Sequence, residues 1–239
     1  MANLTGAERS RYVQEMFTRI ADRYDVMNRL MTAGQDVRWR QEVVRRADLS
    51  PTGRLLDLGA GTGDLSREVL RQHPGCRLVA ADFTLEMMRI GRSHMAPGEP
   101  AALIEWVSAD GLRLPFPNQA FDAVVSGFLL RNVTDVRLCL AEQYRVLKPG
   151  GRIVTLDTSP PPHSPLAPLI RFHLHTIIPT LGRMITGQAE AYNYLPNSTE
   201  NFLEPEILAA RLAGAGFSQV GFQRLMFGTI AIHWGVKDG

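Results

Sequence analysis

Arg54-Leu-Leu-Asp-Leu-Gly-Ala-Gly-Thr-Gly-Asp64 is the stretch of sequence that decides the fold. Its hydrophobic first half, 54–58, predicts a short buried strand, and the pattern from 64 to 72 predicts a helix. Glycines at every second position join the two elements and let the backbone turn tightly against a ligand. Because a helix begins with unpaired backbone N–H groups, this junction is a candidate ligand site.

Outward from this stretch, hydrophobic runs alternate with helical patterns, which is typical of βαβ units around a parallel sheet. We expect strands at 77–81, 102–107, 121–126 and 152–156, and helices at 84–95, 133–148 and 205–215. The last two runs, 217–225 and 228–234, lie so close together that they predict an antiparallel hairpin. The sequence therefore predicts an α/β fold with a three-layer, Rossmann-like sheet, mostly parallel, that ends in an antiparallel hairpin.

Two segments stand outside this alternation. Within residues 1–48, apolar side chains recur at helical spacing, which predicts an N-terminal helical lid. Residues 158–203 form a long insertion after the fifth strand, and connections of this length usually carry function. We expect one domain, 1–239, in which 158–203 is a cap.

The cap segment carries apolar residues on one helical face between Leu166 and Ile185. Two interpretations are open: this helix packs on its own sheet, or it forms an apolar substrate tunnel or touches a membrane surface. Pro179 should kink or split the helix. His173 and His175 are expected on its solvated face.

The composition excludes several classes of protein. Of the 239 residues, 45% are hydrophobic and 21% charged, which is ordinary for a globular protein and argues against disorder. A net charge of +2 without a basic stripe argues against a nucleic-acid partner. Two cysteines cannot build a disulfide framework, and no residue cluster has metal-ligand spacing, so we expect no metal. With neither a secretory signal nor a long apolar run, we expect a cytoplasmic protein.

The glycine spacing bears on the cofactor. It is GxGxG rather than the GxGxxG of dinucleotide enzymes, and Asp64 places a negative charge where a pyrophosphate needs N–H groups. S-adenosylmethionine (SAM), which has a sulfonium and no phosphate, fits better. Asp82, 19 residues after Gly63, ends the second strand and can accept bonds from two ribose hydroxyls, or else it caps the next helix. Asp110-Gly111, after the third strand, can contact the adenine.

Several longer strings carry a resemblance to a known family. They are Met16-Phe-x-x-Ile-Ala-x-Arg-Tyr-Asp-x-Met-Asn28, Leu114-Pro-Phe-Pro, Leu130-Arg-Asn-Val-Thr-Asp135, Arg145-Val-Leu-Lys-Pro-Gly-Gly151, Tyr192-x-Tyr-Leu195 and Gly228-Thr-Ile-Ala-Ile-His-x-Gly-x-Lys237. Through them, about residues 13–237 resemble the ubiquinone/menaquinone biosynthesis C-methyltransferase family, which has the class I SAM-dependent fold.

The resemblance implies a SAM-dependent methyltransferase that methylates a ring carbon of a polyprenyl quinol, either demethylmenaquinol or a related benzoquinol. By position it implies catalytic roles for two residues. Arg131 would stabilise the phenolate form of the quinol, and Asn132 would orient a substrate oxygen or cap the next helix. The cofactor contacts that we expect are Gly59, Gly61, Thr62, Asp82, Asp110, Gly111 and Gly127, the last standing where the family usually has Ser.

The chain departs from the family pattern at Asp36, Val37, Gly127, Leu129 and Asp157. These departures leave the acceptor open. One alternative is a SAM-dependent methyltransferase of another small molecule, and the other is a catalytically weak SAM-binding partner in a biosynthetic complex. A homodimer and a peripheral contact with the inner face of a membrane also remain open.

Overall fold

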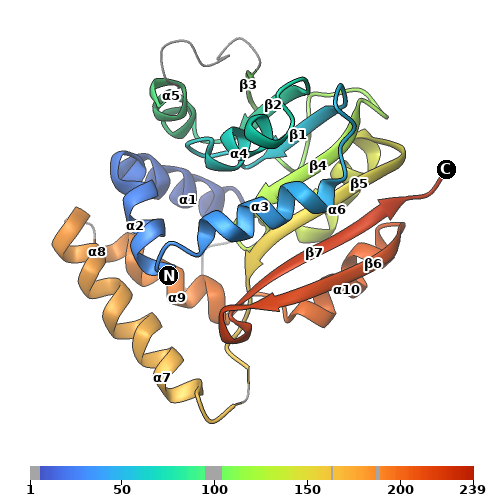
Figure 1. Ribbon diagram of the computed structural model, residues 1–239. Coiled ribbons are helices and arrows are strands. Elements are labelled where there is room, and N and C mark those ends of the chain that lie inside the picture. Colours follow the sequence, from blue (N-terminus) through green and yellow to red (C-terminus); the bar gives the residue numbers. More distant parts are fainter. Residues whose placement is uncertain (1–5, 95–103, 163, 187–188) are drawn as a thin grey trace.

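The computed structural model describes residues 6–94, 104–162, 164–186 and 189–239. In this part of the chain, a seven-stranded sheet has the order β3-β2-β1-β4-β5-β7-β6 (Figure 1). Its strands are β1 (Arg54–Leu58), β2 (Arg77–Asp82), β3 (Ile104–Ser108), β4 (Phe121–Gly127), β5 (Leu147–Thr158), β6 (Phe217–Leu225) and β7 (Ile230–Lys237). The first five strands pair in parallel, while β7 pairs antiparallel with both β5 and β6. The predicted α/β fold with its C-terminal hairpin is confirmed.

Helices cover both faces of the sheet (Figure 1). They are α3 (Asp36–Ala47), α4 (Asp64–Gln72), α5 (Leu85–Ser93), α6 (Val136–Val146) and α10 (Pro205–Gly214). On one face, Val43 of α3 and Val69 of α4 are fully buried in the same apolar cluster. On the other, Leu140 of α6 and Leu212 of α10 are equally buried in a second cluster. Each such side chain contributes roughly 1.5–3 kcal/mol, so the two clusters hold the sheet as a rigid base for its strand ends.

The expected element bounds hold closely near the glycine turn and less well at β5. Strand β1 and helix α4 occupy the predicted residues. Helix α6 ends at Val146, two residues early, because Leu147 already pairs with Phe121 of β4. Strand β5 therefore starts at Leu147 and not at the predicted position 152. Helix α5 ends at Ser93, slightly before the end expected at 95, and the start of the strand expected at 102–107 lies outside the described residues.

The N-terminal and cap segments pack on each other. They comprise α1 (Gly6–Ile20), η1 (Ala21–Arg23), α2 (Tyr24–Met31), α7 (Ala167–Phe172), the π-helical turn η3 (His173–Ile177), α8 (Ile178–Thr186) and α9 (Ala189–Glu200). One apolar cluster joins Met16 and Met27 of the N-terminal helices to Leu174 and Ile178 of the cap. The interpretation that the cap helix packs flat on its own sheet is wrong, since the N-terminal helices supply its apolar partner (Figure 1).

Pro179 does not split the cap helix as expected, since α7, η3 and α8 follow one another without a break from 167 to 186. It has no N–H and its ring would clash with the carbonyl four residues earlier, and the turn immediately before α8 is widened to the π form. The expected apolar face is only partly covered, because Leu166 and Leu169 are 47% and 66% exposed. Among the described residues, no helix is both long and apolar enough to cross a membrane.

Candidate functional site

The turn after β1 is built from glycines in left-handed backbone conformations. Gly59, Gly61 and Gly63 have φ values of 72°, 57° and 82°, which disfavour any residue with a side chain. A Cβ on Gly59 would lie 2.9 Å from Cδ1 of Leu129, and one on Gly61 would lie 3.4 Å from Cε of Met87. The glycines therefore keep a narrow space open between the turn and the loop after β4.

Asp82 closes one side of this space. Its Oδ2 accepts a hydrogen bond from the N–H of Gly61 at 2.8 Å, and its Oδ1 accepts one from the N–H of Thr84 at 2.7 Å. Burial raises the pKa of this carboxyl, and the backbone hydrogen bonds oppose that effect. Thr84, not Asp82, occupies the N-cap position of α5, so the capping alternative for Asp82 is wrong.

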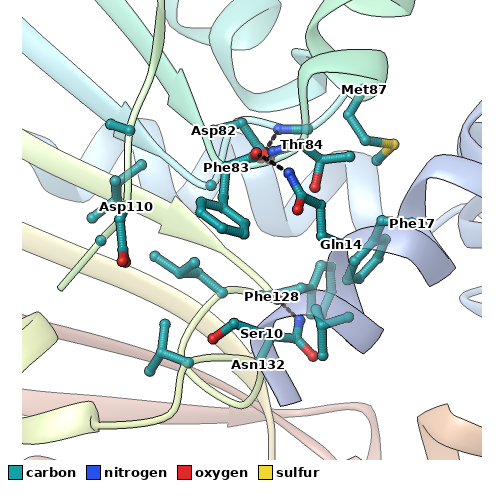
Figure 2. Close-up of a pocket in the computed structure, with 18 of the residues that line it drawn as sticks. Ser10, Gln14, Phe17, Asp82, Phe83, Thr84, Met87, Asp110, Phe128 and Asn132 are labelled. Carbon is teal, nitrogen blue, oxygen red and sulfur yellow. Dashed lines mark hydrogen bonds between the residues drawn. The ribbon is translucent and has the colours of Figure 1, made fainter. Parts of the chain in front are cut away.

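We call the space around this turn the glycine-loop cavity (Figure 2). It brings together seven of the residues expected from the sequence: Gly59, Gly61, Asp82, Asp110, Gly111, Gly127 and Asn132. Helix α1 supplies side chains that were not expected as site residues, namely Ser10, Gln14 and Phe17. Gln14 Nε2 donates to the carbonyl of Phe83 at 2.9 Å, which ties α1 across the cavity to the loop after β2.

Thr62 does not line this cavity, but it lines a smaller neighbouring one together with Gly59, Gly61 and Gly127. Its hydroxyl donates to Oδ1 of Asp25 in α2 at 2.5 Å, so it links the glycine turn to the N-terminal helices. A hydroxyl committed to this partner contacts a ligand less readily than the neighbouring glycines do. Such a pairing spans 37 residues of sequence, and no local pattern signals it.

The carboxylate of Asp64 is also committed to protein partners. Arg40 Nη2 lies 3.1 Å from Asp64 Oδ2, and Arg67 pairs with the other oxygen. The negative charge of Asp64, which argued against a pyrophosphate, is thus paired with two arginines. Arg40 in turn binds Asp36, which is fully buried and accepts a further bond from Thr32 Oγ1 at 2.9 Å. The departure at Asp36 thus serves an ion-pair network.

Asp57, within β1, is a buried acid that the sequence analysis passed over. Ser66 Oγ donates to its Oδ2 at 2.6 Å, while Oδ1 has no hydrogen-bond partner among the described residues. Burial raises the pKa of Asp57 to about 7, and the hydrogen bond from Ser66 opposes this while the nearby charge of Asp82 adds to it. The available signal was a charged residue inside a hydrophobic strand.

A second, apolar cavity of about 420 Å³ lies between the cap, α2 and the ends of β5 and β7. We call it the apolar cavity. Most of its described lining is hydrophobic, and Arg131 is the charged residue in that lining. Phe128, which adopts a φ of 60°, lines both this cavity and the glycine-loop cavity. The loop after β4 therefore separates the two spaces by one aromatic residue.

Asn132 follows Arg131 but belongs to the other cavity. Its Nδ2 donates to the carbonyl of Phe128 at 2.8 Å, and its Oδ1 accepts from the hydroxyl of Tyr194 at 3.1 Å. Helix α6 is capped instead by Asp135, whose side chain accepts from the N–H of Leu138. The capping alternative for Asn132 is wrong.

The other departures from the family pattern have clear positions. Ser126 cannot replace a hydroxyl at Gly127, because it is buried and bonded to Thr155 Oγ1 at 3.1 Å. Leu129 lies against Gly59 in the wall of the glycine-loop cavity, whereas Val37 is 36% exposed on the surface. Across the described part of the chain, no group of three or more His, Cys, Asp or Glu side chains is placed to hold a metal ion.

Sequence comparison finds one family over almost the whole chain. The profile described as the ubiE/COQ5 methyltransferase family matches residues 5–237. A protein of Desulfotalea psychrophila named ubiquinone/menaquinone biosynthesis C-methyltransferase UbiE is 46% identical, over 94% of this chain and 90% of its own length. A demethylmenaquinone methyltransferase of Thermus thermophilus is 45% identical, over 92% of this chain and 99% of its own.

Structural comparison supports the same fold at low sequence identity. The [4+2]-cyclase SpnF superposes with a TM-score of 0.71 and 17% identity, covering 96% of each chain. A phosphoethanolamine N-methyltransferase from Haemonchus contortus, solved with S-adenosyl-L-methionine, superposes with a TM-score of 0.64 and 14% identity over 84% of this chain and 53% of its own. At these identities the likeness concerns the fold, which is that of class I methyltransferases.

Proposed function

The chain belongs to the ubiE/COQ5 methyltransferase family and is a SAM-dependent methyltransferase, and from this premise we propose that its acceptor is a polyprenyl quinol methylated at a ring carbon. The observation that carries the proposal is the pair of cavities that meet at Phe128. One is lined by glycines and carboxylates, as a nucleoside-containing donor requires. The other is apolar with a single described cation, as a lipid with one ionisable ring requires.

The glycine-loop cavity fits SAM. The left-handed glycines leave room for a ligand backbone to approach, and Asp82 ends β2 where an open α/β sheet binds ribose hydroxyls. Asp110 and Gly111 follow β3 on the same edge and would contact the adenine. SAM supplies an electrophilic methyl group when bound. Because Gly127 has no side chain, it would contact SAM through its backbone, at the position where the family usually has a serine hydroxyl.

Arg131 would act on the acceptor. A quinol carbon becomes nucleophilic when a ring hydroxyl loses its proton, because the phenolate pushes electron density into the ring. The guanidinium remains charged in proteins, so it stabilises the phenolate without removing the proton itself. Asn132 and Tyr194, joined by their hydrogen bond, would hold the far edge of the ring against the methyl donor. Alignment of this kind is a major source of rate enhancement.

The N-terminal and cap segments would complete one domain by closing these cavities. Helix α1 covers the glycine-loop cavity, and α7 with α8 covers the apolar cavity. On this basis we assign α1, η1 and α2 as the lid and 158–203 as the cap; the end of the expected 1–48 lid is instead α3, which packs on the sheet.

A lipid acceptor also needs a route from the bilayer, and the cap offers a surface for contact. Leu169, Phe172 and Phe227 line the apolar cavity and yet are 66%, 53% and 73% exposed, so they mark its mouth. Arg171 and Arg183 are exposed on the same cap and suit anionic headgroups. This surface would bind the membrane peripherally. Exchanging Leu169 and Phe227 for Ser should weaken sedimentation with phosphatidylglycerol vesicles, whereas Leu138→Ser, at an exposed position of α6, should not.

The function is tested by product analysis. The purified protein is incubated with SAM and either demethylmenaquinol, a demethylated benzoquinol or a panel of simple phenols, each kept reduced. Mass spectrometry should find one added methyl on a ring carbon of a prenylated quinol. Methylation of phenols alone, or methylation at oxygen, would contradict the proposal. SAM binding without any product would favour the non-catalytic alternative.

A further inference from the structure

Quinol methylation leaves one chemical requirement unmet, namely the acceptor of the ring hydroxyl proton. Arg131 cannot take it, because a guanidinium stays protonated. Its partner Asp157 is buried behind it, 1% exposed, and is not among the residues that line the apolar cavity. The base must therefore be another residue in the cavity wall, a conclusion that rests on the proposed function.

The described lining of the apolar cavity contains two titratable side chains, Arg131 and His173. The other polar residues in that lining are Asn28 and threonines, which do not accept a proton near neutral pH. Imidazole is the side chain that most often serves as a general base. His173 is thus the group in this wall that matches the requirement.

The Nε2 atom of His173 differs from that of two other histidines, although Nδ1 of His233 is also buried without a partner among the described residues. Nε2 of His173 is buried and has no hydrogen-bond partner within the described part of the chain. His175, two residues on, is exposed and bonds Glu200 at 3.0 Å, and His233 bonds the carbonyl of Pro205 at 2.9 Å. The expectation that His173 lies on a solvated face is wrong. Arg131 Nε, Thr158 Oγ1 and Thr199 Oγ1 in the same wall are also buried without a partner in what the structure describes, and such a group of polar atoms points to a missing ligand.

The backbone explains why the sequence pattern misplaced His173. It opens the π-helical turn η3, which widens the helix ahead of Pro179. Such a turn shifts the phase of the residues around it relative to a regular α-helix, and π turns recur at functional sites. The only charged neighbour across the described cavity is Arg131, and the charged neighbour on its own helix, Arg171, is exposed.

We propose that His173 is the general base that takes the proton from a quinol hydroxyl. The imidazole accepts the hydroxyl proton, and the oxygen lone pair moves into the ring. The ring carbon forms a C–C bond to the methyl of SAM while the C–S bond breaks and its electron pair stays on sulfur. That carbon then loses its hydrogen as a proton to water, which restores aromaticity. His173 returns its proton to the oxygen, so one proton is released per turnover.

The test compares His173→Gln with His175→Gln, an exposed neighbour on the same helix. Turnover of demethylmenaquinol is measured between about pH 5 and pH 8, the range in which imidazoles titrate. For the unchanged protein, kcat should rise with pH over this range, since the base must be neutral. H173Q should lower kcat by roughly 100-fold or more and remove that rise, with SAM affinity unchanged. H175Q should leave both kcat and the pH profile unchanged.

Full turnover by H173Q, or a pH-dependent rise retained in it, would overturn the proposal. If H173Q fails to bind SAM, the same measurements are made on His173→Asn. A kcat of the unchanged protein that does not vary with pH would also overturn the proposal. A failure of the proposed function looks different: the unchanged protein would then methylate no quinol at any pH, and the phenol panel would identify the acceptor.

Discussion

Arg131 and Asp157 form an ion pair that is buried from solvent. Nη1 of the arginine lies 2.7 Å from Oδ1 of the aspartate, and the main-chain N–H of Arg131 lies 3.2 Å from Oδ2. The guanidinium also stacks 4.9 Å from the ring centroid of Phe128, and Arg9 Nη2 binds the carbonyl of Arg131 at 2.9 Å. Arg131 is thus held at its side chain and at both of its peptide groups, which fixes the cation in the wall of the apolar cavity.

Asp157→Asn should release this cation. Loss of one partner of a buried pair costs about 3–5 kcal/mol, so the variant should melt at lower temperature. We expect kcat with quinol to fall at least about tenfold, with SAM affinity close to that of the unchanged protein. Calorimetry and turnover measurements check this. Asp122→Asn is the control, because Asp122 pairs with Lys148 at a half-exposed site and such pairs contribute little. Equal kcat values for D157N and D122N would contradict the assigned role.

Asp82→Asn should weaken SAM binding by about tenfold or more, since a charge-assisted hydrogen bond contributes about 1.5–3 kcal/mol. Isothermal titration with SAM measures the loss directly. Glu86→Gln, in the first turn of the adjacent α5, provides a matched control that should bind normally. Unchanged affinity in D82N would show that the carboxylate does not hold the ribose.

The stability of the free protein should depend on pH through Asp57. Its pKa is raised to about 7 in the folded state, above the value of about 3.9 in an unfolded chain. The folded state therefore holds the proton more tightly, and this stabilisation is complete below about pH 4 and is lost as the pH rises towards 7. Urea unfolding at several pH values should show a decline over that window, which Asp57→Asn should reduce. If the free energy of unfolding of Asp57→Asn declined by as much over this pH window, other titratable groups would be responsible for the decline.

Gln14→Ala should loosen the N-terminal helix over the glycine-loop cavity. The lost bond to the carbonyl of Phe83 is worth about 1 kcal/mol, so SAM should dissociate roughly fivefold faster. Stopped-flow displacement measures that rate. Glu15→Ala, one residue along on the exposed side of α1, should dissociate SAM at the rate of the unchanged protein. Equal SAM dissociation rates for the two variants would show that the hydrogen bond of Gln14 does not slow the release of SAM.

Local patterns predicted the fold well because they depend on neighbours in sequence. The hydrophobic run and glycines around Gly59 defined β1 and α4 to the residue, and two adjacent runs predicted the hairpin. Seven expected residues gather at one cavity because parallel strands end at the same edge of the sheet.

Long-range contacts set the limits of that prediction. The hydroxyl of Thr62 is taken by Asp25, and Asn132 is bonded by Tyr194, 62 residues away. The carboxylate of Asp64 is neutralised by Arg40 from another helix. The position of His173 depends on a widened turn, which a regular helical period cannot represent. In each case the decisive partner is distant in sequence or the local geometry is irregular.

The two cavities are covered by different helices: α1 lies over one, and α7 and α8 lie over the other. Under the proposed function, SAM would therefore enter beneath α1 and the acceptor beneath the cap, although α1 and the cap share one apolar cluster. The isoprenoid tail of the acceptor could remain bound in the apolar cavity, near its opening at Phe227, while the donor is exchanged. If both ligands bind as proposed, a water-soluble donor and a lipid acceptor would have separate openings in this fold.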